Sequence, residues 1–449
     1  MNQDSEFLKE KLKQRPLNRK KLLRRMLITI LMAVLFGAVA SATFLLLEPY
    51  ISEYLYTEEE SPPELIVFPE DVYEDEILPI DMIADEKEMQ ELQHSQEVND
   101  EPGITIDDDH IRAIAAEMLG INTVGVDDYL VINAEMLMVA REARRSLVTV
   151  TGLISDINWI NLAFETRGQT TGVIVGETRQ EILILANIST IRNADSLVLT
   201  FMNNKQYTAE IKRFDRETGL GILSLRRAEL DEDTEQMLQV IELGNSSSLL
   251  VTGIPVIAVG RVVGNSDSIS YGHITSSGTP LYMVDAAYKL LTTNIYGNTN
   301  ASGIVINMRG QLLGVIDNSN NTIEARNIVS AIGISELKKL IENMCNDIGK
   351  PFLGIVGTDV TSEANEILGV PYGAYITEVR VDTPAMESGL RSGDVIVRIG
   401  EVNINSFAAF HSALFEYLPE DTVTLMVMRQ GVDGFREFVA EVVTWQPEQ

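Results

Sequence analysis

Two hydroxyl side chains lie close together in a run of small residues, and hydroxyl groups of this kind can act as nucleophiles in acyl transfer. They are Thr299 and Ser302, in the run Thr-Asn-Ala-Ser-Gly that ends at Gly303. Such a hydroxyl is almost fully protonated at neutral pH, so it needs a base within hydrogen-bond reach. The histidine nearest to this run in the sequence is His273, and the next one towards the N-terminus is His110. One possible constellation is therefore Thr299 or Ser302 with His273.

Cysteine and histidine are too scarce for disulfide or multi-thiolate chemistry. The single cysteine, Cys345, excludes a disulfide within the chain, and we interpret it as a small apolar residue near a helix end. Three consecutive acids at 107–109 precede His110 and could suggest a metal, but such carboxylates are typical of a helix cap and first turn. We expect no metal and no cofactor.

The charge is distributed in blocks that predict a membrane anchor. The 449 residues carry a net charge of −31, with +6 in residues 1–25, none in 26–47 and −21 in 48–109. A helix over the uncharged segment would be about 33 Å long, which matches the hydrocarbon core of a bilayer. The basic cluster before it places the N-terminus in the cytoplasm. We therefore expect one transmembrane helix over 26–47, in the cell membrane, with everything beyond it extracytoplasmic.

Two further inferences follow from these blocks. A cleaved signal peptide is the alternative to an anchor, because Ala38, Ala40 and Ala42 resemble a cleavage region, but the apolar run continues to residue 47 and favours an uncleaved anchor. A chain this acidic is also a poor binder of nucleic acid, since phosphate backbones require basic surface.

The acidic, proline-containing segment 48–109 predicts a mostly extended, disordered stalk, because it cannot bury enough apolar surface to fold alone. Short apolar islands at 65–68 and 77–83 could dock on a folded domain, although we favour a solvated linker. A helical lead-in over 110–146 follows, with helices expected over 111–119 and 134–145.

From residue 147 the pattern predicts a mainly β domain. Short runs rich in β-branched residues alternate with turn residues, which indicates an all-β sandwich or barrel over 147–346. An amphipathic helix over 334–345 closes the domain, and residues 349–351 form a hinge. The β runs are 147–152, 172–176, 182–186, 196–201, 207–211, 221–225, 251–263 and 303–316.

These residues resemble the trypsin-like double β-barrel domain of the HtrA/Deg family of membrane-associated serine proteases. The segments that match motifs of the family, in the family's order, are Gly-Gln-Thr-Thr-Gly-Val-Ile (168–174), 213–225, 243–248, 253–260, 270–276 and Asn-Met-Arg-Gly-Gln-Leu-Leu-Gly-Val (307–315).

The resemblance implies a degenerate catalytic triad. The family's histidine, aspartate and serine positions fall on Ser189, Gly219 and Ala301, while a shifted alignment would offer Thr299 as nucleophile. Ser302 follows the nucleophile position, so its side chain should point elsewhere. Thr299 replaces a glycine of the oxyanion turn and, being β-branched, resists a positive φ. The sequence therefore implies a pseudoprotease.

Residues 351–446 resemble the PDZ domain of the same family, an α+β fold. Its carboxylate-binding loop falls on residues 352–355, and a helix over 406–417 would flank the peptide groove. In such a site, backbone N–H groups hold a terminal carboxylate and the peptide adds a strand. The candidate peptide-binding residues are Phe352, Leu353, Gly354, Ile355, Phe407, His411 and Leu414.

Two functions follow from the resemblance. The first is a membrane-anchored scaffold that captures the C-termini of proteins, or unfolded envelope proteins, through its PDZ domain. The second is an active endopeptidase in envelope quality control with a non-standard nucleophile. The resemblance also implies a homotrimer, or mixed oligomers with active relatives.

Overall fold

The computed structural model describes some residues between 28 and 43 and the ranges 64–71, 125–157, 163–189 and 191–446. Contacts divide the chain into two units, residues 1–64 and 65–449. In the first unit the described residues between 28 and 43 are helical. Among the described residues, no helix is both long enough and apolar enough to cross a membrane. The expected helix over 111–119, the island at 77–83, His94 and His110 lie outside the described residues.

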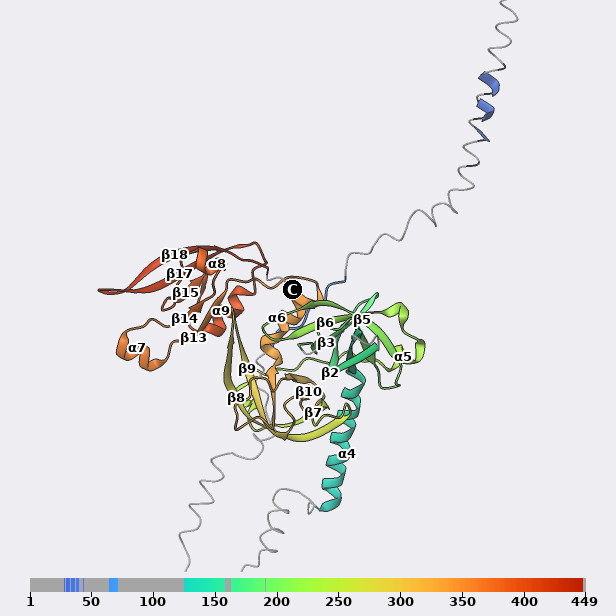
Figure 1. The fold of residues 1–449 in the computed structure, drawn as a ribbon, viewed down its shortest axis with the longest axis horizontal. Helices are drawn as coiled ribbons and strands as arrows, with labels where there is room; N and C mark the ends of the chain where they lie inside the picture. Colours follow the sequence, from blue (N-terminus) through green and yellow to red (C-terminus); the bar gives the residue numbers. More distant parts are fainter. Residues whose placement is uncertain are drawn as a thin grey trace, which may run out of the picture. The chain divides into compact units, whose positions relative to one another are not determined.

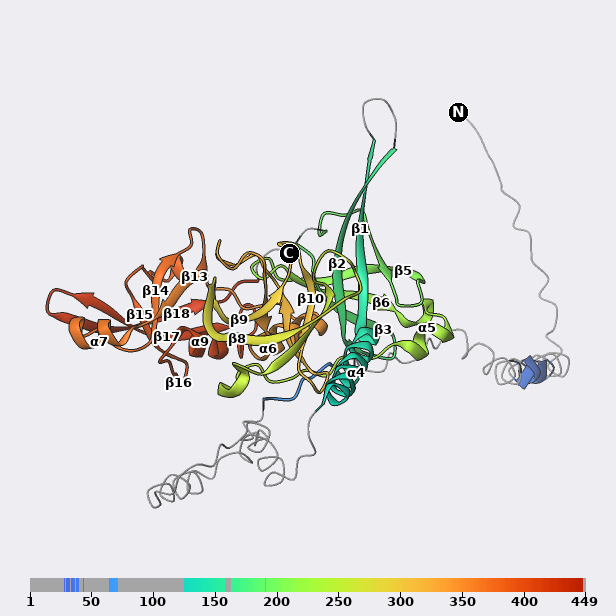
Figure 2. The same cartoon turned by 90° about the horizontal axis from the view of Figure 1, so that it is seen from below.

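Two closed six-stranded antiparallel barrels form the centre of the second unit (Figure 1). Their strand orders are β1-β2-β3-β6-β5-β4 and β10-β11-β12-β9-β8-β7. Figure 2 shows β1 and β2 extending beyond the first barrel as a long hairpin. The strands are β1 (Leu147–Ile157), β2 (Ala163–Glu177), β3 (Glu181–Asn187), β4 (Ser196–Thr200), β5 (Gln206–Phe214), β6 (Leu220–Arg226), β7 (Pro255–Arg261), β8 (Ser268–Met283), β9 (Ala286–Tyr296), β10 (Ser302–Ile306), β11 (Leu312–Ile316) and β12 (Ile328–Gly333).

A six-stranded sheet follows the barrels, together with three helices in the described part of the chain. Its strand order is β13-β14-β15-β17-β18, with β16 paired to β15. Apolar side chains of α9 fill the core beneath this sheet, and Ser406 caps the helix by accepting a hydrogen bond from the Ala409 N–H. The elements are β13 (Ile355–Asp359), α7 (Ser362–Leu368), β14 (Ala374–Val379), α8 (Pro384–Glu387), β15 (Val395–Ile399), β16 (Val402–Asn403), α9 (Phe407–Leu414), β17 (Thr422–Gly431) and β18 (Gly434–Val443).

Three helices belong to the barrel region: α4 (Val126–Ala143), α5 (Glu232–Met237) and α6 (Ile334–Cys345). Helix α6 closes the β domain as expected, and Cys345 is buried in its last turn. Burial raises the pKa of the Cys345 thiol to about 12, which keeps it protonated and agrees with a structural role.

Residues 65–71, within the segment expected to be a stalk, lie against α6. The Asn346 side chain binds the backbone of Ile66 through both of its polar atoms, at 2.9 Å to the N–H and 2.7 Å to the carbonyl oxygen. The side chains of Ile66 and Phe68 pack against the main core cluster. Of the two interpretations of the apolar segment 65–68, a solvated linker or a segment docked on a folded domain, the structure shows the docked one.

The fold class expected from the sequence is confirmed: the protein is mainly β, with a double barrel followed by an α+β domain. Expected and observed strands differ most over 268–296, where β8 and β9 form a long hairpin of which the sequence indicated only the part at 270–276.

Candidate functional site

The candidate catalytic positions gather in one cleft of about 680 Å³ where the two barrels meet. Its described lining includes the positions at which the sequence places the degenerate triad and the alternative nucleophiles, but no histidine. The five candidates in this lining are Ser189, Gly219, Thr299, Ala301 and Ser302. The fold thus brings together side chains that are up to 113 residues apart in the sequence.

Ser189 and Gly219 are direct neighbours on the first barrel. A β-carbon built on Gly219 would lie 1.9 Å from the Ser189 Oγ, and Gly219 has a φ of +70°. The Ser189 hydroxyl donates to the Asn187 Oδ1 over 2.8 Å. The two positions are therefore in direct contact, and neither a serine nor a glycine can supply a base or an orienting carboxylate.

Ser302 is held by a neighbouring strand. It is 8% exposed, and its Oγ accepts a hydrogen bond from the Thr171 N–H over 3.0 Å. Ala301 is also 8% exposed and packs in the core of the second barrel. The Ser302 hydroxyl satisfies a buried backbone donor, and it has no hydrogen bond to a basic side chain in the described part of the chain.

Thr299 is exposed in a turn closed by a 3.1 Å hydrogen bond from the Ala301 N–H to the Asn298 carbonyl. No residue of this turn has a positive φ, as expected for a β-branched residue at the glycine position. His273 is exposed on β8, opposite Pro255 of β7, and is not among the residues that line the cleft. The structure therefore does not bring His273 together with Thr299 or Ser302 in this cleft.

A buried ion pair lies next to the turn that carries Gly219. The Lys350 Nζ lies 3.1 Å from the Asp215 Oδ1, and both side chains are at most 8% exposed. Burial would raise the pKa of Asp215, but Lys350 and the hydrogen bonds from Thr218 outweigh burial and lower it. Asp215 also accepts from the Thr218 N–H over 2.9 Å, next to Gly219. The pair thus fixes the turn that carries Gly219.

The expected carboxylate-binding loop does hold a carboxylate. The N–H groups of Leu353 and Gly354 donate to the Asp285 Oδ2 over 2.8 and 2.7 Å, and that of Ile355 donates to Oδ1 over 2.8 Å. Gly354 has a φ of +91°, and a β-carbon there would collide with Thr383. The N–H of Phe352 instead pairs with the carbonyl of Trp445, so Phe352 contributes no donor to the carboxylate.

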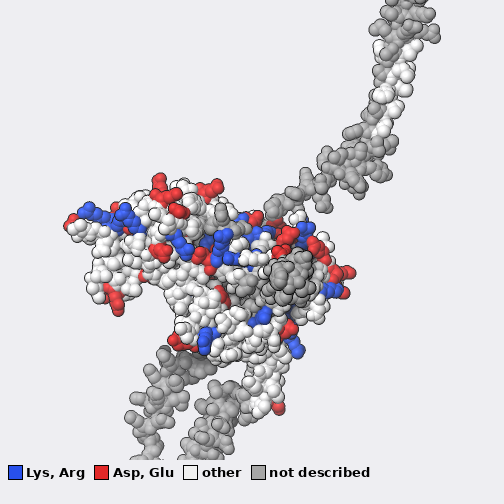
Figure 3. Space-filling view, in the orientation of Figure 1, with Lys and Arg blue, Asp and Glu red and all other residues white. Residues whose placement is uncertain are grey.

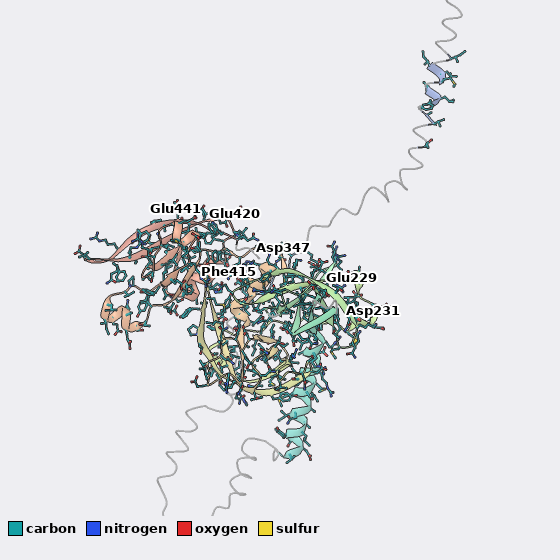
Figure 4. All side chains as sticks on the ribbon, in the orientation of Figure 1. Glu229, Asp231, Asp347, Phe415, Glu420 and Glu441 are labelled. Atoms are coloured by element: carbon teal, nitrogen blue, oxygen red, sulfur yellow. The ribbon has the colours of Figure 1, made fainter. Side chains whose placement is uncertain are left out.

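The flanking helix α9 faces the same hairpin that carries Asp285. His411 is 4% exposed, and its Nδ1 donates to the carbonyl oxygen of Ala287 over 2.9 Å. The Tyr288 ring lies edge-on to His411, with centroids 5.1 Å apart, and the ring of Phe415, labelled in Figure 4, is also edge-on to His411 at 4.6 Å. Phe407 and Leu414 are fully buried. His411 therefore contacts the β8–β9 hairpin instead of solvent.

We expect acid to weaken the packing around His411. Burial lowers the pKa of His411 to about 4, below its value of about 6.5 in the unfolded chain. Between pH 6.5 and pH 4, His411 is therefore protonated in the unfolded chain but neutral in the folded protein. The contribution of neutral His411 to the free energy of unfolding is full above pH 6.5 and decreases as the pH falls towards 4. The expected loss is about 3 kcal/mol.

Urea unfolding at pH 7 and pH 4.5 checks this prediction. His411→Gln cannot titrate, so it should lose less stability over the same interval than the wild type does. Burial also raises the pKa of Asp285, so protonation of Asp285 increases the free energy of unfolding as the pH falls, opposite to the effect of His411. Both the wild type and His411→Gln contain Asp285, so the difference between them reports on His411. Equal pH dependence in both would contradict the assignment.

Comparison with known proteins agrees with the two-domain architecture. Residues 170–315 match the trypsin-like peptidase domain family and residues 351–434 match the PDZ domain family. A probable periplasmic serine endoprotease, DegP-like, from Chlamydia trachomatis serovar D is 28% identical over 272 residues, covering 58% of this chain and 51% of that protein. The chain is an HtrA/Deg-like protein. The serine protease Do-like HtrB of Bacillus subtilis is 25% identical over 281 residues, covering 58% of this chain and 59% of that protein.

Solved structures show the same fold. The HtrA-type protease AlgW with a decapeptide has a TM-score of 0.52 at 19% identity and covers 70% of this chain and 99% of that chain. AlgW with a tripeptide also gives 0.52 at 19% identity and covers 70% and 98%. This HtrA/Deg-like chain spans about half the length of the first curated relatives that it matches.

Asp285 is a residue of the site that the sequence patterns do not reveal. Its signal is faint: a Val-Asp dipeptide separates the alternating runs of β8 and β9, and Asp285 has a φ of +56° in the turn between them. A hairpin turn of this kind is common for aspartate, and the sequence does not show that the turn reaches a loop about 70 residues further along.

Proposed function

We propose that this HtrA/Deg-like chain is a proteolytically inactive, membrane-anchored protein of the cell envelope that acts by binding peptide C-termini through its PDZ domain. One observation is the main support for the lack of proteolytic activity. The cleft that gathers Ser189, Gly219 and Ala301 has no histidine in its described lining, and the nearby Ser302 hydroxyl is held by Thr171. Without a base, a hydroxyl in this cleft is not activated.

The carboxylate loop supports peptide binding. Three consecutive backbone N–H groups converge on one carboxylate, which is the arrangement that captures a C-terminus. AlgW, a structural neighbour, has been solved with peptides. Figure 3 shows Lys and Arg interspersed with Asp and Glu on the visible face, which agrees with a protein partner better than with a polyanion.

A fluorophosphonate probe together with a casein digest tests the inactive cleft. We expect no labelling of the wild type and no cleavage under any condition. Labelling that Thr299→Ala or Ser302→Ala abolishes would instead support the alternative of an active endopeptidase with a relocated nucleophile. His273→Ala separates the two further, because only the alternative predicts an effect of this variant.

The anchor rests on the uncharged segment 26–47 and the basic residues before it. Protease added to intact spheroplasts should trim the acidic segment, and an epitope at residue 20 should be accessible only after permeabilisation. A mature chain that begins near residue 43 would contradict the anchor and support a cleaved signal peptide. Pull-down from membranes, with sequencing of the C-termini of bound proteins, identifies the partners and also tests for homotrimers or mixed oligomers.

A further inference from the structure

The turn of the β8–β9 hairpin lies inside the carboxylate loop of the PDZ domain. Asp285 is fully buried, and its two carboxylate oxygens accept all three N–H groups of Leu353, Gly354 and Ile355. Its own N–H donates to the carbonyl oxygen of Ile355 over 2.7 Å. A carboxylate and an N–H of one residue therefore bind the loop and the start of β13 together.

This set of contacts is the set that a C-terminal residue would make. A terminal carboxylate needs a nest of backbone N–H groups, and a peptide that adds a strand donates its N–H to a carbonyl of the groove strand. Asp285 satisfies both requirements with a side-chain carboxylate. The loop has no further N–H group among 353–355 to offer a second carboxylate, so the two ligands exclude each other.

The residues beside Asp285 contact the two elements that flank the carboxylate loop. Ala287 belongs to the apolar core of the PDZ domain and accepts the hydrogen bond from His411 of α9. Before the turn, the Tyr282 ring lies edge-on to Phe407, with centroids 5.8 Å apart. The hairpin thus contacts both β13 and α9, and Figure 1 shows α9 beside the start of β9.

We propose that the Asp285 carboxylate is an intramolecular ligand of the carboxylate loop, and that a peptide C-terminus binds this groove only when it displaces Asp285. The inference rests on the proposed peptide-binding function and adds its regulation: the PDZ domain is closed by the second barrel of the same chain. Because only the open fraction binds a peptide, the apparent dissociation constant of the wild type is increased by the inverse of that fraction.

Removing the Asp285 side chain tests the internal ligand without any knowledge of the peptide. Asp285→Gly suits this purpose because glycine tolerates the φ of +56°. Asp285→Asn keeps the size of the side chain and removes the charge. Asp382→Gly is the matched control, since Asp382 has a φ of +55° and is exposed on the PDZ domain.

Hydrogen exchange of the fragment that covers 353–355 is the first measurement, made on the full-length protein. We expect exchange at least about tenfold faster in Asp285→Gly than in the wild type, an intermediate rate in Asp285→Asn and no change in Asp382→Gly. Acetate should slow exchange again in Asp285→Gly, while acetamide and matched chloride should not. Unchanged exchange in Asp285→Gly, or equal effects of acetate and acetamide, would overturn the proposal.

Binding of octapeptides with random sequences and free C-termini is the second measurement, with the same peptides carrying a C-terminal amide as the control. We expect the free-carboxylate pool to bind Asp285→Gly at least about tenfold more tightly than the wild type or Asp382→Gly. Equal affinity would overturn the displacement by peptide. Acetate could slow exchange in Asp285→Gly while no variant binds peptide. This result would support Asp285 as the ligand of the loop and would contradict the proposed capture of C-termini.

Discussion

The triple variant Ser189→His, Gly219→Asp, Ala301→Ser is expected to react with a fluorophosphonate probe that does not label the wild type. The three positions already lie around one cleft, so the substitutions place a nucleophile, a base and an orienting carboxylate in the same site. Single substitutions should give no labelling, because the members of a triad act as a unit. The double variant that retains Ala301 is the control, since it has a base but no new nucleophile.

Geometry also predicts which single variant folds poorly. A β-carbon at Gly219 would lie 1.9 Å from the Ser189 Oγ, so Gly219→Asp alone requires Ser189 to move. Ser189→His alone meets no such obstacle from Gly219. We expect thermal unfolding to occur at a lower temperature for the first single variant than for the second.

The turn at Thr299 limits the rate of the triple variant. This turn has no positive φ, and the loss of one oxyanion donor reduces turnover by about 10²–10³. Adding Thr299→Gly should therefore increase the rate of labelling by up to this factor. Ser302 should stay, because its Oγ is the partner of the buried Thr171 N–H, and an unpaired donor there would cost about 1–3 kcal/mol.

Probe labelling followed by mass spectrometry of the labelled peptide checks these results. In the triple variant the label must be on residue 301. Labelling of the wild type would contradict the inactive cleft, and absence of labelling in both the triple and the quadruple variant would contradict the placement of the triad positions.

Local patterns predicted the strands that are rich in β-branched residues, because alternation and turn residues lie within a few positions of each other. The runs at 182–186 and 221–225 fall within β3 and β6, which pair with each other in the first barrel. Helix α9 was also indicated by Phe407, Phe410 and Leu414 at helical spacing, and all three are buried.

Contacts between distant segments could not be predicted in this way. The bonds between Ile66 and Asn346 join residues 280 positions apart, and an apolar island in an acidic segment gives no sign of its partner. Strand β8 is rich in Ser, Thr and Gly, so its alternation of apolar and polar residues is weak. From the sequence, His411 could either contact a ligand or be exposed without contacts. In the structure it is buried and contacts Ala287 and Tyr288 of the β8–β9 hairpin.

Lys350→Met is expected to lower the free energy of unfolding by about 3–5 kcal/mol, since it leaves the Asp215 carboxylate buried without its partner. Asp215→Asn should also lower the free energy of unfolding, because it leaves the Lys350 ammonium group buried without its partner. The double variant should lose less than the sum of the two single losses, because no buried charge is left unpaired. Lys339→Met is the matched control: Lys339 pairs with Glu342 at 3.4 Å while 44% exposed, and such a pair contributes less than about 1 kcal/mol.

Urea unfolding of the four variants and the wild type gives these differences. Burial raises the pKa of Asp285, and the charge of Lys350 opposes this less than the three backbone N–H groups do. Lys350→Met should therefore speed hydrogen exchange at 353–355 only slightly, while Asp215→Asn should not speed it. In that case the ion pair stabilises the turn at Gly219, and Lys350 also stabilises the contact between Asp285 and the carboxylate loop. Additive losses in the double variant would contradict the coupling, and equal exchange in the two single variants would limit Lys350 to its role beside the cleft.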